Sequence, residues 1–241
     1  MFTLEWYLWL LISAIIITTL TILSLKLKWN KQLVTYIMAG VCIVSELVKI
    51  FSHMQPVYDE EGYVIMRYAL PLHLCSIFIF VIFYLALSKN EERKNVLISF
   101  LVPIGIIGSL IALLLATSGV DFKAPYAYQA YIYHACLLWY SLYFVLTKQV
   151  DLGKKAYIRN LIILFSLAIV MIWINGALYD DGSYNVNFMF LVRPPADGLP
   201  FLNLKHGWYA YFAHLSFSGI VLETLFSLPY ILKERKRKEN I

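Results

Sequence analysis

The sequence has few charged residues: only 15% of its 241 residues are Asp, Glu, Lys or Arg, whereas 61% are hydrophobic. A soluble domain averages about 25% charged and roughly 45–50% apolar residues, so this composition excludes an ordinary soluble domain. The apolar runs of about 20 residues are long enough to cross roughly 30 Å of hydrocarbon as helices. They also lack the alternating pattern of a membrane β-barrel. The sequence therefore predicts an all-α, polytopic membrane protein.

Cysteine is scarce, and none lies in a polar loop: Cys42, Cys75 and Cys136 all fall within apolar runs. An odd number of cysteines in such places argues against a disulfide framework. The spacings H-x-x-x-H and C-x-x-C are absent as well. Such spacings are the usual sequence signature of a metal site, and because they are absent we expect no metal and no cofactor.

The first apolar run has no basic segment before it. Glu5 stands at its start, and Lys26, Lys28 and Lys31 follow it. This order is the reverse of a secretory signal, so we expect a retained helix.

Seven helices are expected in a single transmembrane domain spanning residues 1–241. No internal repeat and no linker divides the chain. Gly105 and Ser109, four residues apart, predict close packing of the fourth helix. The expected helices cover about 5–25, 33–53, 70–88, 95–117, 127–148, 158–179 and 208–231.

The Lys and Arg residues predict the orientation of these helices. Seven spans with alternating loops leave only five of the 20 basic residues on one side: Lys49, Arg67, Lys123, Arg193 and Lys205. Basic residues concentrate in cytoplasmic loops, so we expect the N-terminus outside and the C-terminus in the cytoplasm of a cell-membrane protein. The net charge of +5 follows from this placement, and we expect no nucleic-acid partner. The proline-rich outer segment 180–207 is too short to span and is expected to cap the bundle.

Polar residues collect near the predicted outer face of the second helix. Glu46, Lys49 and His53 share one helical stripe. A charge inside a bilayer is costly and normally faces a partner in the bundle interior. Glu46 and Lys49 are therefore either a structural ion pair or part of a functional site. Glu223, in the last helix, falls nearer to the cytoplasmic side and apart from this stripe.

Cys75 and His134 form the candidate catalytic pair. Both lie roughly 8–10 Å from the outer ends of their helices, so they can meet if the third and fifth helices are neighbours. A thiolate is a strong nucleophile, and a histidine can take the thiol proton. His73 is nearer in sequence but points to a different side of the helix. It is the poorer base and a candidate substrate-binding residue.

Further outer-side residues are candidates for binding or support. The planar fork of Arg193 can hold a phosphate or carboxylate, with Asn187 beside it, or it can simply contact lipid headgroups. Tyr133 belongs to the tyrosine-rich segment "APYAYQAYIYH", which fits either an interfacial aromatic belt or a headgroup pocket. Supporting roles are expected for Glu46, Lys49, Asn175 and His214.

Three segments, "LPLHLCS" (70–76), "YIYHACLLWY" (131–140) and "NFMFLVRPP" (187–195), resemble the YwaF family of bacterial integral membrane proteins. The family is similar, more distantly, to an animal transmembrane acyltransferase of ether-phospholipid remodelling. More remotely it resembles the androgen-induced hydrolases of fatty-acid esters. The resemblance implies acyl chemistry in the membrane, with a cysteine in the third-helix motif and a later histidine as catalytic residues. By motif position these are Cys75 and His134.

Three functions remain open from the sequence. The leading hypothesis is a membrane-embedded acyltransferase or acyl hydrolase acting on lipid esters of the outer leaflet, with phospholipid or lysolipid as its partner. The second is a proton-coupled transporter that uses Glu46, Lys49 and the outer-side histidines. The third is a non-enzymatic lipid-binding receptor or scaffold, since a seven-helix fold does not itself give a function.

Overall fold

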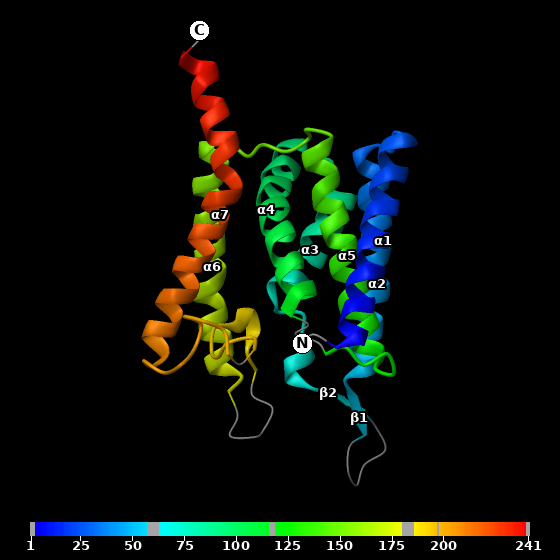
Figure 1. The fold of residues 1–241 in the computed structure, drawn as a ribbon, viewed down its shortest axis with the longest axis vertical. Helices are drawn as coiled ribbons and strands as arrows, with labels where there is room; N and C mark the ends of the chain where they lie inside the picture. The colour runs from blue at the N-terminus through cyan, green and yellow to red at the C-terminus, as the bar shows by residue number, and fades with distance from the viewer. Residues whose placement is uncertain (1–2, 57–62, 116–118, 180–185, 197, 240–241) are drawn as a thin grey trace.

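The computed structural model describes residues 3–56, 63–115, 119–179, 186–196 and 198–239, and these form a helical bundle with one short hairpin (Figure 1). The helices are α1 (Leu4–Lys26), α2 (Lys31–Ser52), α3 (Leu74–Leu87), α4 (Glu91–Leu115), α5 (Pro125–Leu146), α6 (Lys154–Ala177) and α7 (Trp208–Glu239). Strands β1 (Met54–Pro56) and β2 (Tyr63–Ile65) pair antiparallel, with Gln55 opposite Val64. Two 3₁₀ turns complete the described chain: η1 (Arg67–Ala69) and η2 (Phe188–Phe190).

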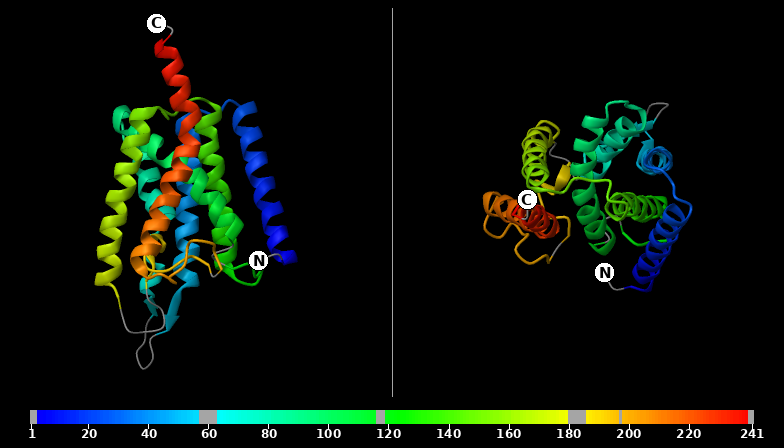
Figure 2. Two further views of the ribbon diagram at one scale, coloured as in Figure 1. Left: turned by 60° about the vertical axis from the view of Figure 1, so that its left-hand side comes forward. Right: turned by 90° about the horizontal axis from the view of Figure 1, so that it is seen from above.

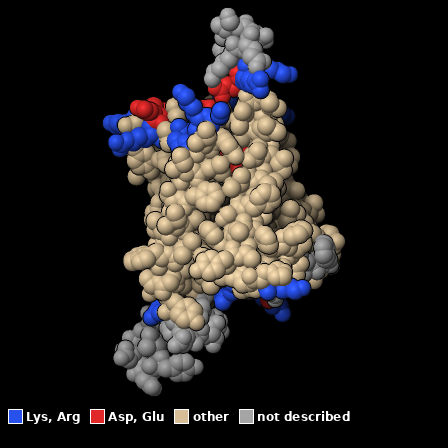
Figure 3. Space-filling view, turned by 90° about the vertical axis from the view of Figure 1, so that its left-hand side faces the viewer, with Lys and Arg blue, Asp and Glu red and all other residues tan. Residues whose placement is uncertain are grey.

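Five helices, α1, α2, α4, α6 and α7, are long and apolar enough to cross a membrane. Helix α3 is apolar but has only 14 residues, and α5 has 22 residues, six of which are tyrosines. On the face drawn in Figure 3, charged side chains gather at the two ends of the molecule, and the broad belt between them shows almost none. The described chain thus has the character of a membrane protein, while the count of seven spans and the outward N-terminus stay predictions.

The two ends of the bundle differ, and each takes a name. The hairpin end carries β1 and β2, and α1, α3, α5 and α7 begin there (Figure 1). The basic end is where these four helices finish, close to Lys26, Lys89 and Lys148.

Polar caps set where several helices begin. The Thr3 hydroxyl accepts from the backbone N–H of Trp6 at the start of α1, and Asn30 Oδ1 accepts from Leu33 N (2.8 Å) at the start of α2. Such caps satisfy backbone donors that have no partner within the helix. Pro125 occupies the first turn of α5, where its missing N–H costs nothing.

Helix α3 is shorter than the expected range 70–88. Leu70 precedes Pro71 and adopts an extended conformation (φ −56°, ψ 144°), because a residue before proline is disfavoured in the helical region. The helix therefore begins at Leu74, and His73 is its N-cap residue. The expectation that 70–73 would be helical was wrong. Helix α7 instead runs past the expected position 231, because Lys, Arg and Glu continue a helix well.

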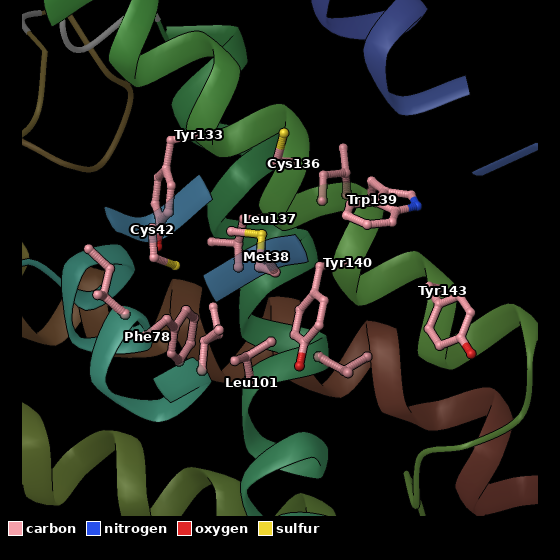
Figure 4. Close-up of a cluster of buried hydrophobic side chains, with 14 of the residues drawn as sticks. Met38, Cys42, Phe78, Leu101, Tyr133, Cys136, Leu137, Trp139, Tyr140 and Tyr143 are labelled. Carbon is pink, nitrogen blue, oxygen red and sulfur yellow. The ribbon is translucent and has the colours of Figure 1, made fainter. Parts of the chain in front are cut away.

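Helix α5 is the centre of the bundle formed by α1 to α5. It packs against α1, α2 and α4 and buries large aromatic side chains, including Trp139, Tyr140 and Tyr143 (Figure 4). Helices α4 and α5 approach closely at Gly105, where an added Cβ would lie 2.5 Å from Ser141 Oγ. Around this core, α3 packs against α2 and α4 but has little direct helix packing with α5. Helices α2, α3, α4 and α5 therefore form a ring in which α3 and α5 occupy opposite corners.

Helices α6 and α7 form a separate pair that packs on α4 (Figure 2). At the hairpin end, the segment around η2 fills the space between this pair and the start of α3. Its buried residues Val186, Phe188 and Leu191 join Met171 of α6, with Leu72 and Ile77 packed against them. The described part of the segment 180–207 therefore covers the start of α3, and residues 180–185 and 197 lie outside the described chain.

Candidate functional site

Cys75 and His134 meet inside the ring of α2, α3, α4 and α5. Cys75 is the second residue of α3, and His134 lies in the first half of α5. The imidazole of His134 is near enough to the thiol of Cys75 for the two groups to influence each other electrostatically. Side chains from opposite corners of the ring thus reach one another without close packing of their helices.

The two ring nitrogens of His134 are in different protonation states. Nδ1 lies 2.7 Å from the backbone carbonyl oxygen of Ala130. Because a carbonyl oxygen can only accept, Nδ1 carries the proton and donates. In the neutral ring, Nε2 is then the nitrogen with a free lone pair. This tautomer leaves an acceptor available for the thiol proton of Cys75.

Tyr133 fixes the backbone next to the thiol. Its hydroxyl donates to the carbonyl oxygen of Cys75 over 2.6 Å, and the ring is 2% exposed. The same hydroxyl also interacts with Cys42 of α2, and the two lie side by side in Figure 4. Tyr133 therefore connects α5 to both α3 and α2 at the depth of Cys75.

Lys49 brings a positive charge to the site from α2. Its ammonium group lies 2.8 Å from Glu46 Oε1 and donates to Ser76 Oγ over 3.5 Å. The side chains of Lys49 and Glu46 are 14% and 21% exposed, so the pair is largely shielded. Its charge also acts on Cys75 and His73. Glu46 and Lys49 do form an ion pair, and Lys49 at the same time reaches the residue next to Cys75.

His73 packs against the η2 segment rather than against the Cys75 thiol. Its ring centroid lies 5.6 Å from that of Phe188 and 5.2 Å from that of Phe190. His53, at the end of α2, donates from Nδ1 to Lys49 O (2.8 Å), and its ring contacts Tyr68. The two histidines thus border the site at the hairpin end.

The η2 segment is held in a strained conformation by buried hydrogen bonds. Met189 and Phe190 both have φ of 55°, in the left-handed region that non-glycine residues rarely adopt. The side chain of Asn175, on α6, donates to Phe188 O (3.0 Å) and accepts from Phe188 N (2.8 Å). Tyr211 donates to Phe190 O, and Trp208 Nε1 donates to Leu191 O (2.7 Å).

Asn187 closes the turn that follows η2. Its Nδ2 donates to Arg193 O (2.9 Å), and its Oδ1 accepts from Val192 N (3.0 Å) and Arg193 N (3.1 Å). Both polar atoms of this amide therefore bind the backbone of the loop itself. The side chain of Arg193 lies exposed on this loop.

His214 lies in α7, beside a pocket of about 280 Å³ at the hairpin end. Its Nδ1 donates to Phe201 O (2.8 Å). Lys205 and His206 also line this pocket. The structure thus groups six of the candidate residues around one point: Cys75, His134, Tyr133, Lys49, Glu46 and His73. Asn187 lies in the η2 segment and Asn175, on α6, binds that segment. His214 lines the pocket instead.

Sequence reasoning missed Ser76, Phe188 and Phe190 as neighbours of the site. Ser76 is adjacent to Cys75 in "LPLHLCS", but its contact with Lys49 depends on how α2 and α3 pack. Phe188 and Phe190 fall in an apolar stretch that carries no chemical signal of its own. Within the described residues, no group of three or more His, Cys, Asp or Glu side chains is arranged to hold a metal ion.

Comparisons with known proteins give one match. The model of the TMEM164 family matches residues 1–227, which is nearly the whole chain. Neither the curated proteins nor the solved structures contain a match. The comparisons name no YwaF protein, so that finer resemblance stays an expectation.

Proposed function

The chain belongs to the TMEM164 family, and from this premise and the geometry around Cys75 we propose that it is a membrane-embedded acyltransferase or acyl-ester hydrolase for lipids. The observation that supports the proposal is the electrostatic interaction between the Cys75 thiol and the His134 imidazole. A nucleophile within reach of a base, with the base oriented by a third group, is the arrangement used for covalent acyl transfer. Ala130 O is the orienting group for His134.

In the first half-reaction, His134 Nε2 takes the proton of the Cys75 thiol. The thiolate attacks the carbonyl carbon of a lipid ester and forms a tetrahedral intermediate. When the intermediate collapses, the bond to the alcohol oxygen breaks, and the lysolipid alkoxide takes the proton from His134. The acyl group is then held on Cys75 as a thioester.

In the second half-reaction, an acceptor hydroxyl attacks the thioester. The acceptor is the hydroxyl of a second lysolipid in a transferase and water in a hydrolase. His134 Nε2 takes the acceptor's proton, the carbon–sulfur bond breaks, and the proton returns to Cys75. The pair is restored at the end of each cycle.

Lys49 is the candidate to stabilise negative charge during both steps. Its ammonium group acts on Cys75, and it is held near the thiol by Glu46 and Ser76. A fixed positive charge in a shielded site stabilises a thiolate or an oxyanion more strongly than it would in water. Glu46 therefore positions Lys49, and His73 borders the space where the substrate enters.

A lipid substrate is supported by the depth of the site. Cys75 is the second residue of α3, so it is only about 1.5 Å along the helix axis from the first residue, at the hairpin end. The ester bonds of a phospholipid lie just below the headgroups. We therefore propose that the hairpin end faces the outer leaflet of the cell membrane, and that Arg193 contacts the headgroup or its phosphate.

Purified protein in nanodiscs with an acyl-labelled phospholipid and an unlabelled lysolipid tests the activity. Wild type is expected to give labelled transfer product or free fatty acid. Cys75→Ala and His134→Gln should lose turnover at least about 100-fold, the usual range for removing a base or nucleophile. Cys136→Ala is the matched control, because this buried thiol has no such histidine contact in the described chain. Turnover that survives Cys75→Ala would overturn the proposal.

A further inference from the structure

A second polar cluster lies near the basic end, far along the helices from Cys75. Glu223 of α7 is 2% exposed and Asn160 of α6 is 1% exposed. Asn160 is six residues into α6, about 9 Å from its start at the basic end. Helix α4 is the third helix of this cluster: it contributes Ser99 and packs against both α6 and α7. The proposed acyl chemistry uses none of these residues.

The orientation of the Asn160 amide is determined by its acceptors. Nδ2 donates one hydrogen to Ser99 O (2.7 Å) and the other to Glu223 Oε1 (3.3 Å). A carbonyl oxygen cannot donate, so the amide nitrogen must face Ser99 O, and Oδ1 is an acceptor only. Ser227 Oγ also donates to Glu223 Oε1, over 3.5 Å.

The remaining oxygens of this pair are buried acceptors without a donor. Asn160 Oδ1 and Glu223 Oε2 have no hydrogen-bond partner among the described residues. Each such buried acceptor costs about 1–3 kcal/mol if it stays unpaired. They belong to two side chains that already share the Nδ2–Oε1 hydrogen bond. One proton on Oε2 would supply the missing donor for Oδ1 and close a ring of two hydrogen bonds between acid and amide.

From this geometry we propose that Glu223 and Asn160 form a proton-binding site, in which neutral Glu223 donates from Oε2 to Asn160 Oδ1. The bound proton holds α7 to α6, and the Nδ2 bond to Ser99 O holds both to α4. The site is therefore a set of hydrogen bonds that joins the α6–α7 pair to the rest of the bundle. It stands independently of the acyl chemistry proposed for Cys75.

The neighbouring charged and polar groups fit a proton better than an ion pair. Arg159, next to Asn160 on α6, donates from Nη2 to Ser99 Oγ on α4, and its buried Nε has no hydrogen-bond partner among the described residues. No salt bridge joins Glu223 to a basic side chain in the described chain, and the other polar groups nearby, Tyr157 and Thr224, bond to each other (2.8 Å). A buried carboxylate without a counter-ion is costly inside a membrane, whereas a neutral acid paired with an amide is not.

Glu223→Gln tests the proposal, because a glutamine amide can form both hydrogen bonds with Asn160 without a proton. Infrared spectra of the protein in nanodiscs should show a carboxylic-acid C=O band in wild type that Glu223→Gln removes. Glu92→Gln, at an exposed position of α4, is the matched control and should keep the band. If Glu223→Gln shows the same carboxylic-acid bands as wild type, the proposal is wrong.

Thermal unfolding gives a second readout. The folded state keeps a proton that the unfolded state releases above the ordinary pKa of glutamate, about 4.3. The melting temperature of wild type should therefore fall as pH rises above that value, until Glu223 also ionises in the folded state. Glu223→Gln should remove that fall and match or exceed wild type at alkaline pH. A sodium-specific rise in melting temperature that Glu223→Gln abolishes would mean that the site holds a cation instead, and would contradict the proposal.

Asn160→Ala keeps the test decisive if Glu223→Gln does not fold. This variant removes the acceptor of the proposed Oε2–H bond. The acid band should then move to the frequency of a more weakly hydrogen-bonded acid. An unchanged band would show that Asn160 is not the partner of the proton.

Discussion

Around Cys75, nearly every polar atom has one fixed partner, and this limits what each side chain can do. His134 Nδ1 donates to Ala130 O, Tyr133 donates to Cys75 O, and Lys49 is shared between Glu46 and Ser76. The groups left with reactive capacity are the Cys75 thiol and His134 Nε2. At the scale of the residue, the account thus assigns reactivity to Cys75 and positioning to its neighbours.

Replacing His134 by Gln should slow the reaction of Cys75 with a thiol-directed alkylating reagent, because the base that takes the thiol proton is lost. We expect a decrease of about tenfold or more, the effect of roughly 1.4 kcal/mol on a barrier. The rate is measured by mass spectrometry of the peptide that contains Cys75. His206→Gln, an exposed histidine at the same end, is the control and should leave the rate unchanged. Equal rates in wild type and His134→Gln would remove His134 from the mechanism.

Tyr133→Phe should cost about 1 kcal/mol of stability, because it removes one hydrogen bond to Cys75 O and keeps the ring. Thermal unfolding in nanodiscs measures the loss. Tyr128→Phe, an exposed tyrosine of α5, is the comparison and should be close to neutral. A destabilisation no larger than that of Tyr128→Phe would show that the Tyr133 hydroxyl does not hold the start of α3.

At the scale of the element, the η2 segment is the part under strain. The left-handed conformation of Met189 and Phe190 costs roughly 1–2 kcal/mol per residue, and the hydrogen bonds from Asn175, Trp208 and Tyr211 offset it. The strained turn places Phe190 against His73, at the border of the site. Strain that is held in place in this way is typical of functional loops.

Asn175→Leu should destabilise the segment most, because it leaves both the N–H and the C=O of buried Phe188 without a partner. We expect a loss of about 2–5 kcal/mol from two such groups. Hydrogen exchange of the backbone around Phe188 reports it, with exchange faster by orders of magnitude. Asn203→Ala, an exposed Asx turn in the same loop, should have little effect. Unchanged protection at Phe188 would contradict this account of the segment.

The same elements show what sequence could predict. Apolar runs predicted every α-helix to within a few residues at most ends, because a helix that crosses the hydrocarbon needs about 20 consecutive apolar residues. The start of α3 was missed because Pro71 acts on the conformation of Leu70, which hydropathy does not report. The hairpin β1–β2 and the η2 turn were missed because they are short and depend on contacts with distant segments.

At the scale of the whole molecule, the ring of α2, α3, α4 and α5 explains how Cys75 and His134 come together. The sequence predicted equal depths of Cys75 and His134 from the starts of their helices, and this was wrong: α3 begins at Leu74, so Cys75 is its second residue, whereas His134 is the tenth residue of α5. The placement of α3 and α5 at opposite corners of the ring was not predicted, because helix packing depends on the surfaces of all four helices. The sequence also did not predict that the side-chain amide of Asn187 forms hydrogen bonds with the backbone of its own loop. The α6–α7 pair packs as a second unit on α4, with η2 joining it to the site.

The predicted orientation can be tested on the whole chain. In sealed right-side-out vesicles, a membrane-impermeant maleimide should label Lys205→Cys, because this position lies at the hairpin end, which is predicted to face outward. Lys155→Cys, at the start of α6, should be labelled only after the vesicles are permeabilised. Both changes are made in a Cys75→Ala background to remove the native thiol of the site. Labelling in the opposite order would reverse the orientation.

The central claim is that Cys75 carries the acyl group during the reaction. The most direct measurement is mass spectrometry of the protein quenched with acid during turnover of a defined phospholipid. The account predicts a mass increase equal to one acyl chain on the peptide that contains Cys75, removed by neutral hydroxylamine as a thioester is. An active protein that never shows this adduct, or an adduct that persists in Cys75→Ala, would contradict it.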